Sequence, residues 1–414
     1  MKNRRIVVTG LGVIAPNGIG KEKFWNALKN GIPGIRKISR FDASDYPTQI
    51  AGEVNDFDPS EFIPAKSLKR MSRSSQFAVV ASKLAVEDSK LVIEPNDVER
   101  IGVIMGTSIG GQGWIYDQHL KFLEGGYRKI NPFTSISVYP NACSTEVSIS
   151  LGIKGPSETF SFGCSSSLSA VAFATYMINS DLTDIMLIGG AEAPLESPIF
   201  AALCMSGNLS IRNDEPKKAS RPFDQKRDGL VVSEGAGVLV LEELSHAIKR
   251  GAHIYAEICG WGETCDAYHP FIPDPDVAQP ARAIELALKN ADCSVYDIDY
   301  ICALGLSLRL TDIAETKAIK KVFKDLAYKI PISSIKSMIG QPFAAAGALQ
   351  LITSVLAIEN SVIPPTINYE FPDPECDLDY TPNVSKTAQI DCVLIQTFAF
   401  GGKNVVLVVK KYKK

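Results

Sequence analysis

The chain has 414 residues, of which 45% are hydrophobic and 21% are charged, with 4 histidines and 9 cysteines. This apolar content excludes a disordered chain, and 31 glycines and 24 prolines without a period exclude a collagen-like one. A net charge of −3 provides no strong field for nucleic acid or for an anionic membrane, so we expect neither as a partner.

Short apolar runs alternate with longer helical stretches along the chain, a pattern typical of α/β layers around a mostly parallel sheet. The first strand is predicted at residues 6–8, ended by Gly10 and Gly12, and a helix at 74–86. The segment 206–228, rich in Ser, Asn, Lys, Arg and Asp, predicts an exposed loop. Further strands are predicted at 101–105, 185–188, 237–241, 254–258, 300–303 and 405–409, and a further helix at 279–290.

The chain divides near residue 250, after the polar run at 249–251. Both parts contain alternating strands and helices, so we predict two similar α/β halves, residues 1–250 and 251–414. No short internal repeat is visible, which argues against a solenoid or a propeller.

The cysteines are scattered, odd in number and contain no Cys-x-x-Cys pair. This argues against a disulfide framework and against a zinc site, so we expect no metal and a reducing, cytoplasmic location. The start, Met1–Arg5, is basic, but the apolar run at 6–8 that follows is too short for an export signal. No run approaches the roughly 18 apolar residues of a membrane span.

Cys164 is the candidate nucleophile. It follows a short predicted strand at 159–162 and Gly163, and a predicted helix at 165–177 follows it. A cysteine at a helix N-terminus is close to unpaired amides and to the positive end of the helix dipole, which stabilise a thiolate. From spacing alone, the interpretation of Cys164 as a small buried residue is the more frequent one, as most free cysteines are of this kind.

The segment Gly155-Pro156-Ser157 and the run Cys164-Ser-Ser-Ser-Leu resemble the active-site segment of β-ketoacyl-acyl-carrier-protein synthases, closest to the synthase II type. The resemblance implies a thiolase-like fold with duplicated α/β halves in five layers (αβαβα), usually dimeric, and Cys164 as the acyl-accepting cysteine. It extends over the whole chain through motifs at 7–16, 220–224, 227–229, 234–237, 266–269, 315–319, 336–340 and 398–402.

Two histidines of that family are missing here. In the family they bind the thioester carbonyl of a malonyl unit and stabilise the enolate formed as carbon dioxide leaves. The Ala-His-Gly-Thr pattern is matched by Ala303-Leu304-Gly305-Leu306, and the Lys-Ser-x-x-Gly-His pattern ends at Gln341. Leu304 donates no hydrogen bond, and Gln341 offers one neutral donor but no proton transfer. Loss of one oxyanion donor typically costs about 10²–10³ in rate.

None of the four remaining histidines fills these positions by spacing. His119, His246 and His253 lie in polar stretches and are expected to be solvated, whereas His269 matches a histidine that such synthases carry besides the catalytic pair.

Other parts of the family's site remain. Lys336 and Glu315 match charged residues near the active site, and their alternative role is a buried ion pair that fixes loops. Asp312, near the start of the helix that follows the 304 loop, is expected as a cap. Phe400, followed by two glycines, resembles the flexible loop that gates the site and helps to form an oxyanion hole, although such a run is otherwise an ordinary turn.

An intact scaffold without the histidine pair resembles a chain-length factor, the inactive subunit that pairs with an active ketosynthase in type II polyketide systems. Chain-length factors commonly have another residue at the position of Cys164, so two alternatives stay open: an acyltransferase that loads Cys164, and a synthase II with an unusual donor set. The expected partners are an active ketosynthase in a heterodimer, or a second copy, and acyl carrier protein. No cofactor is expected, because the phosphopantetheine belongs to the carrier.

Carrier proteins are acidic, so a docking surface should be locally basic. Lys66, Lys69, Arg70 and Arg73 fall at helical spacing before the helix at 74–86, and Arg212, with its neighbours at 217–218, lies in the predicted loop. A solvated charged face explains the same pattern about as well.

Overall fold

A computed structural model describes residues 4–95 and 97–413, so Met1–Asn3 of the basic N-terminal segment lie outside it. One mixed sheet of eleven strands runs through the described chain in the order β11-β10-β14-β15-β9-β1-β8-β7-β5-β6, with β2 beside β1. The strands are β1 (Ile6–Ala15), β2 (Gly18–Ile19), β5 (Ile101–Gly106), β6 (Ser157–Phe160), β7 (Ile185–Glu192), β8 (Gly235–Glu243), β9 (Ala256–Cys265), β10 (Tyr300–Cys302), β11 (Ile332–Ser333), β14 (Cys392–Phe398) and β15 (Lys403–Lys410). Two small hairpins, β3 (Ile35–Lys37) with β4 (Ile50–Gly52) and β12 (Val362–Ile363) with β13 (Lys386–Thr387), lie outside this sheet.

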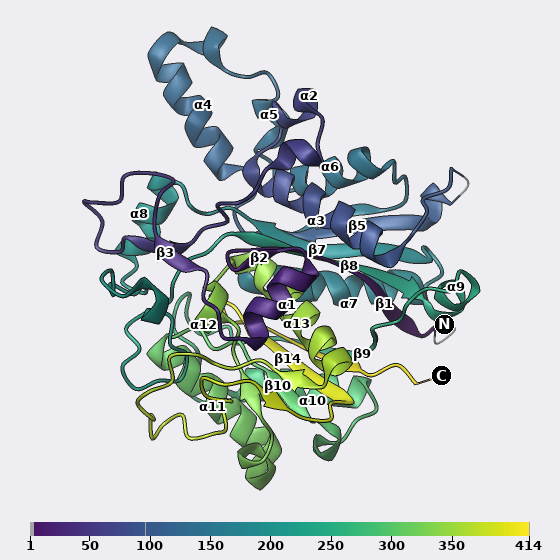
Figure 1. Ribbon diagram of the computed structural model, residues 1–414, viewed down its shortest axis with the longest axis vertical. Coiled ribbons are helices and arrows are strands. Elements are labelled where there is room, and N and C mark those ends of the chain that lie inside the picture. Colours follow the sequence, from purple (N-terminus) through teal and green to yellow (C-terminus); the bar gives the residue numbers. More distant parts are fainter. Residues whose placement is uncertain (1–3, 96, 414) are drawn as a thin grey trace.

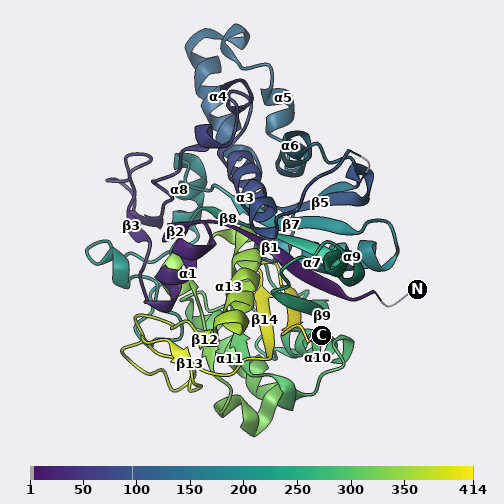
Figure 2. The same ribbon diagram turned by 45° about the vertical axis from the view of Figure 1, so that its right-hand side comes forward.

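Helices form three layers around the two halves of the sheet (Figures 1 and 2). The helices α3 (Arg73–Ser89) and α6 (Ala142–Leu151) cover the outer face of the half that contains β1, β5, β7 and β8. Between the halves lie α7 (Ser166–Asn179) and α13 (Ala346–Asn360), and the other outer face carries α10 (Ala278–Asn290) and α11 (Arg309–Phe323). This is the duplicated αβαβα arrangement that the resemblance implies. The division at residue 250 stays a prediction.

The first strand is longer than predicted. It continues through Gly10 and Gly12, which were expected to end it. Helix α3 packs so closely on β1 that a Cβ on either glycine would collide with a backbone carbonyl, of Ala85 or of Ala81. These glycines therefore permit a helix to approach the sheet and do not form a turn.

The other predicted elements are present with shifted ends, and the main omissions are β14 and α13. The apolar helix at Phe343–Asn360, which includes α13, is long enough to cross a membrane, but 83% of it is buried inside the fold. Its placement between the two halves of the sheet makes it a core helix.

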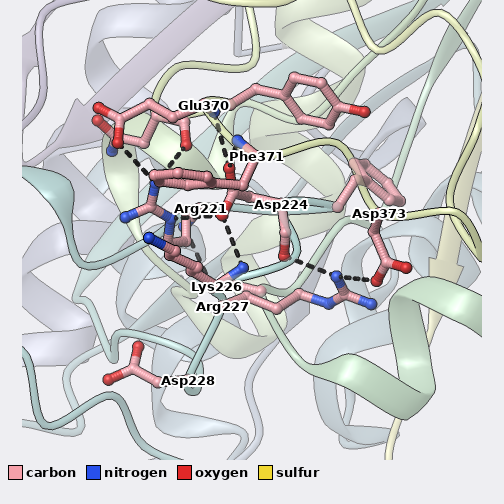
Figure 3. A network of polar contacts seen from close by, with 12 residues as sticks. Arg221, Asp224, Lys226, Arg227, Asp228, Glu370, Phe371 and Asp373 are labelled. Carbon is pink, nitrogen blue, oxygen red and sulfur yellow. Dashed lines mark hydrogen bonds and ion pairs between the residues drawn. The ribbon is translucent and has the colours of Figure 1, made fainter.

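The segment 206–228 is only partly an exposed loop. Arg221, Asp224 and Arg227 are 2%, 0% and 8% exposed and form a network of polar contacts with residues 370–373 (Figure 3). Arg221 Nε lies 3.0 Å from Asp224 Oδ1, and Arg227 Nη1 lies 2.7 Å from an Asp373 carboxylate oxygen. The charges are buried because each has a partner, which the composition of the segment alone does not reveal.

Away from the layered core, α4 (Gln112–Gly125) and α5 (Thr134–Ser137) project from the body of the molecule (Figure 1). The remaining helices are α1 (Lys21–Lys29), α2 (Ala65–Leu68), α8 (Ser197–Met205), α9 (Leu244–Lys249) and α12 (Lys336–Ile339).

Candidate active site

Cys164 lies in a 3-10 turn, Gly163–Ser165, between β6 and α7. Gly163 has φ +63°, and Ser166 fixes the turn because its hydroxyl donates to the Gly163 carbonyl at 2.6 Å and accepts from the Phe162 amide at 2.9 Å. The turn packs against β14 and β15, whose connecting loop carries Phe400. The structure therefore places Cys164 where the sequence predicts it, at the start of a helix and beside the glycine-containing loop.

The thiol of Cys164 is not the stabilised thiolate expected from its place at the helix start. The residue is 5% exposed, and burial raises the pKa of its thiol to about 11. The Gln341 amide and the Lys336 ammonium act in the opposite direction, but they do not outweigh burial. The thiol is therefore protonated at neutral pH in this conformation.

The loop that begins at Leu304 keeps its shape through backbone contacts. The Glu315 carboxylate accepts hydrogen bonds from the Leu304 amide at 2.7 Å and from the Gly305 amide at 2.8 Å. Gly305 has φ +43°, and the Ser334 hydroxyl donates to its carbonyl at 2.8 Å. The Leu304 side chain is fully buried in an apolar cluster with Phe223. It leaves no polar group at the position of the first missing histidine.

Gln341 is 2% exposed, and its backbone is held to Val231 and Ser233. Its side-chain amide influences the Cys164 pKa, yet within the described residues neither its oxygen nor its nitrogen makes a well-aligned hydrogen bond. The second missing histidine is thus replaced by a neutral, unpaired amide close to the thiol.

Lys336 and Glu315 do not form the buried ion pair considered from the sequence. Lys336 Nζ donates to Gln350 Oε1 at 3.1 Å, and no salt bridge joins it to Glu315 among residues 4–95 and 97–413. Burial is the largest cause of the shift at both groups: it raises the pKa of the Glu315 carboxyl and lowers that of the Lys336 ammonium. Both residues support the loops around the site.

The expectation that Asp312 caps the helix after the 304 loop is wrong, because the N-cap of α11 is Leu308 and Asp312 lies in the first turn of the helix. Asp312 instead holds the 304 loop and a neighbouring turn. Its carboxylate accepts from the Leu306 amide and from the Phe223 amide, both at 2.9 Å, and lies 3.3 Å from Arg227 Nε. Burial raises the pKa of Asp312 to about 6, although Arg227 opposes this shift. The buried network of Figure 3 therefore reaches the loop of the first missing histidine through Arg227.

The histidines do not replace the missing pair. His119 lies on α4, His253 is exposed and contacts Glu359, and His246 is half-buried against Glu242 at 2.7 Å. His269 lines a small cavity together with Phe400, but its Nδ1 accepts hydrogen bonds from the amides of residues 271 and 272 at 3.1 Å each. His246 is thus in contact with a buried carboxylate, whereas the sequence predicted a solvated side chain.

Phe400 separates two cavities of different size. A cavity of about 30 Å³, large enough for a water molecule or two, is lined by His269, Leu306, Phe400 and their neighbours. An apolar cavity of about 520 Å³ lies beside α8 and is lined by Leu203, Phe343 and Phe400, among others. Phe271 borders both cavities, and its ring lies 5.5 Å from that of Phe400. The sequence did not point to Phe271 or to the apolar cavity.

The basic residues predicted for carrier docking differ in whether a carboxylate of the same chain already pairs with them. Arg70 makes two 3.0 Å hydrogen bonds to Glu146, and Arg73 is paired with Glu234. Lys66 and Lys69 are exposed; the first lies in the four-residue helix α2 and the second ends it. Arg212 lies 3.8 Å from Glu215, which also binds Lys218. The non-helical residues between α2 and α3 separate Lys66 and Lys69 from Arg73, so these residues do not share one helix face.

In the part of the chain that the structure describes, no group of three His, Cys, Asp or Glu side chains is arranged to hold a metal ion.

Residues 3–247 match the family model "Beta-ketoacyl synthase, N-terminal domain", and residues 255–370 match "Beta-ketoacyl synthase, C-terminal domain". The 3-oxoacyl-[acyl-carrier-protein] synthase 2 of Synechocystis sp. is 43% identical over 413 residues, covering 100% of this chain and 99% of the relative.

Two solved structures show the same fold. The ishigamide ketosynthase/chain length factor has a TM-score of 0.93 and 37% identity, over 99% of this chain and 100% of that chain. A structure described as a type II PKS acyl-carrier protein in complex with its ketosynthase bound to the hexaketide has a TM-score of 0.91 and 35% identity, over 100% of both chains. These matches confirm the predicted thiolase-like fold.

Proposed function

Because the chain belongs to the β-ketoacyl synthase family, we propose that it is a non-condensing partner subunit, similar to a chain-length factor, that acts beside a complete ketosynthase. The pair would elongate fatty acid or polyketide chains on acyl carrier protein, with no cofactor beyond the carrier's phosphopantetheine. One observation carries this proposal: the two positions that should bind the malonyl thioester hold a buried leucine, Leu304, and a neutral amide, Gln341.

The energetic consequence is large. Each lost oxyanion donor costs about 10²–10³ in rate, and losses within one site are not simply additive. The buried Cys164 thiol, with its raised pKa, and the small cavity beside Phe400 further disfavour a complete condensation cycle in this subunit.

Exposed apolar side chains support pairing with a similar subunit. Strand β6 lies at the end of the sheet, and next to it Phe162, Phe173 and Tyr176 are 46%, 38% and 51% exposed. An unpaired edge strand with aromatic side chains around it is a typical interaction surface. The projecting α4 and α5 add further exposed apolar residues: Ile115, Leu120, Phe122, Leu123 and Ile136.

A second candidate function is acyl transfer or condensation through Cys164. It is favoured by the intact thiol, by the apolar cavity of about 520 Å³, which has the size and lining of an acyl pocket, and by the name of the Synechocystis relative. In the transfer step the Cys164 sulfur would bond to the acyl carbon as the carrier thioester breaks, and the thiol proton would pass to the departing pantetheine sulfur.

One experiment separates the two functions. The protein is purified alone and together with a complete Cys-His-His ketosynthase of the same organism, and malonyl-carrier decarboxylation and condensation are measured. The partner-subunit proposal predicts no condensation by the isolated protein, a stable complex, and activity of that complex that survives Cys164→Ala. Robust condensation by the isolated protein would reject it. An acyl adduct that is absent from Cys164→Ala would support the second function.

For carrier docking we propose Lys66 and Lys69, because both are exposed and neither is paired with a carboxylate among the described residues. The ion pairs of Arg70 and Arg73 reduce what these two arginines add to the local field.

A further inference from the structure

Three cysteines from distant parts of the chain meet beside Lys410, at the end of β14 and β15 that is remote from Phe400. Cys392 begins β14 and lies directly opposite Lys410 in the antiparallel pair with β15. Cys259 is the extra residue of a β-bulge in β9, and Cys293 follows the last turn of α10. Strand β14 has seven residues, so this cluster lies about 20 Å from the Phe400 loop.

One carbonyl oxygen links Lys410 to the Cys293 thiol. Lys410 Nζ donates to the Ala291 carbonyl at 3.2 Å, and the Cys293 thiol donates to the same carbonyl oxygen at 3.6 Å. Cys259 and Cys293 both pack against the buried apolar cluster that contains Cys392. Figure 2 shows α10, β9 and β14 meeting near the C-terminal end of the chain.

The three thiols differ in exposure and therefore in the chemistry available to them. Cys392 is 4% exposed, and burial raises its pKa; burial also raises the pKa of the Cys259 thiol, to about 12. Cys293 is partly exposed and lies beside the Lys410 ammonium. Thiol–disulfide exchange requires access to the attacking sulfur, so Cys293 is the cysteine of this group that reacts first with a small disulfide.

The surroundings fix both sulfur atoms in place. The Cys293 amide donates to the Leu288 carbonyl at 3.0 Å, which closes the end of α10. The Cys392 amide donates to Asp299 Oδ2 at 3.0 Å, and its carbonyl accepts from the Asp299 amide at the same distance. An accessible cysteine beside a buried second cysteine is the arrangement of a redox-sensitive pair.

We propose that Cys293 and Cys392 form a thiol–disulfide site that reacts with low-molecular-weight disulfides such as oxidised glutathione. The Cys293 thiolate attacks one glutathione sulfur, the glutathione disulfide breaks, and one reduced glutathione leaves. The Cys392 thiol then attacks the Cys293 sulfur of this mixed disulfide, gives up its proton, and releases the second glutathione. Two cysteine thiols are oxidised and one glutathione disulfide is reduced. The bond ties the end of α10 to the start of β14.

The test uses the full-length, reduced protein. It is incubated with oxidised glutathione, the free thiols are blocked with N-ethylmaleimide, and peptides are mapped by mass spectrometry. The expected product is a Cys293–Cys392 cross-link without bound glutathione. Cys265, an exposed cysteine, is the internal control, because it should take up glutathione and keep it. The oxidised protein should also melt several degrees higher, because the bond closes a loop of about 100 residues.

Single substitutions separate the two steps. Cys392→Ser should leave glutathione on Cys293, whereas Cys293→Ser should leave Cys392 free to react with N-ethylmaleimide. If Cys265 takes up glutathione while Cys293 and Cys392 both stay reduced, the proposal is wrong. A Cys259–Cys293 bond, or glutathione retained on Cys293 in the unchanged protein, would equally overturn it. The site does not depend on the proposed function.

Discussion

Arg227 should be among the most costly single residues to replace. Its guanidinium is buried; Nη1 contacts Asp373 and the Asp224 carbonyl, both at 2.7 Å, and Nε lies 3.3 Å from Asp312. Arg227→Met keeps an apolar stem but removes the charge, so two carboxylates lose their cation. Asp312 is fully buried and cannot recover this loss from water. Breaking one partner of a buried pair typically costs 3–5 kcal/mol, so we expect a loss of about 4 kcal/mol of unfolding free energy.

Urea unfolding followed by tryptophan fluorescence measures this change. The matched control is Arg309→Met, whose side chain is 66% exposed in its pair with Glu375 and should cost less than about 1 kcal/mol. Adding Asp312→Asn to Arg227→Met should recover part of the loss, because the unpaired carboxylate disappears. A cost below about 1 kcal/mol for Arg227→Met would refute the assignment of this network as a structural support of the site.

Three further predictions concern the candidate site and its surroundings. Gln341→Leu removes two buried, unpaired polar atoms and should raise the unfolding free energy by about 1–2 kcal/mol, seen as a higher Tm; a lower Tm would show that the amide has a partner. The folded-state pKa of Asp312, about 6, lies above its ordinary 3.8, so the folded protein holds the extra proton between these values. The unfolding free energy of the unchanged protein relative to Asp312→Asn should therefore fall by up to about 3 kcal/mol from pH 4 to pH 6 and then level off; a flat difference in urea titrations would contradict this. Lys66→Glu with Lys69→Glu should weaken acyl-carrier binding about tenfold at low salt and little at high salt, as measured by surface plasmon resonance. The control, Lys217→Glu with Lys218→Glu, should have little effect, and equal affinities for both pairs would exclude Lys66 and Lys69 as the docking surface.

The order of most elements could be predicted from the sequence because buried strands appear as short apolar runs between turn residues. The omitted β14 and α13 are buried on all sides, so they show no contrast between an apolar and a polar face. The exceptions have physical causes. Gly10 and Gly12 have the composition of a turn, but they permit the close approach of α3, whose contacting residues, Ala85 and Ala81, lie far away along the chain. Arg221 and Arg227 have the composition of an exposed loop, yet they are buried because carboxylates from residues 370–373 and from Asp312 compensate them.

The position of the candidate site could be predicted from the sequence, but the state of its thiol and the shape of its cavities could not. The motifs identified Cys164 and the two replaced histidines, since these depend on residue identity. The state of the thiol could not be predicted, because the helix start favours a thiolate while burial opposes it, and only the structure shows that burial is the larger effect. The contact between Phe271 and Phe400, which both line the two cavities, could not be predicted either, because the two rings come from loops far apart in the chain.

The hydrogen bonds by which Glu315 holds the 304 loop have a consequence for which substitutions the loop can accept during evolution. Its carboxylate binds the amides of Leu304 and Gly305, and no side chain of the loop takes part in these two bonds. These two bonds therefore do not depend on which side chain stands at position 304. A reactive group can be exchanged there for an inert one without disturbing the scaffold, so architecture can persist after chemistry is lost, and the reverse substitution would meet a backbone already in place.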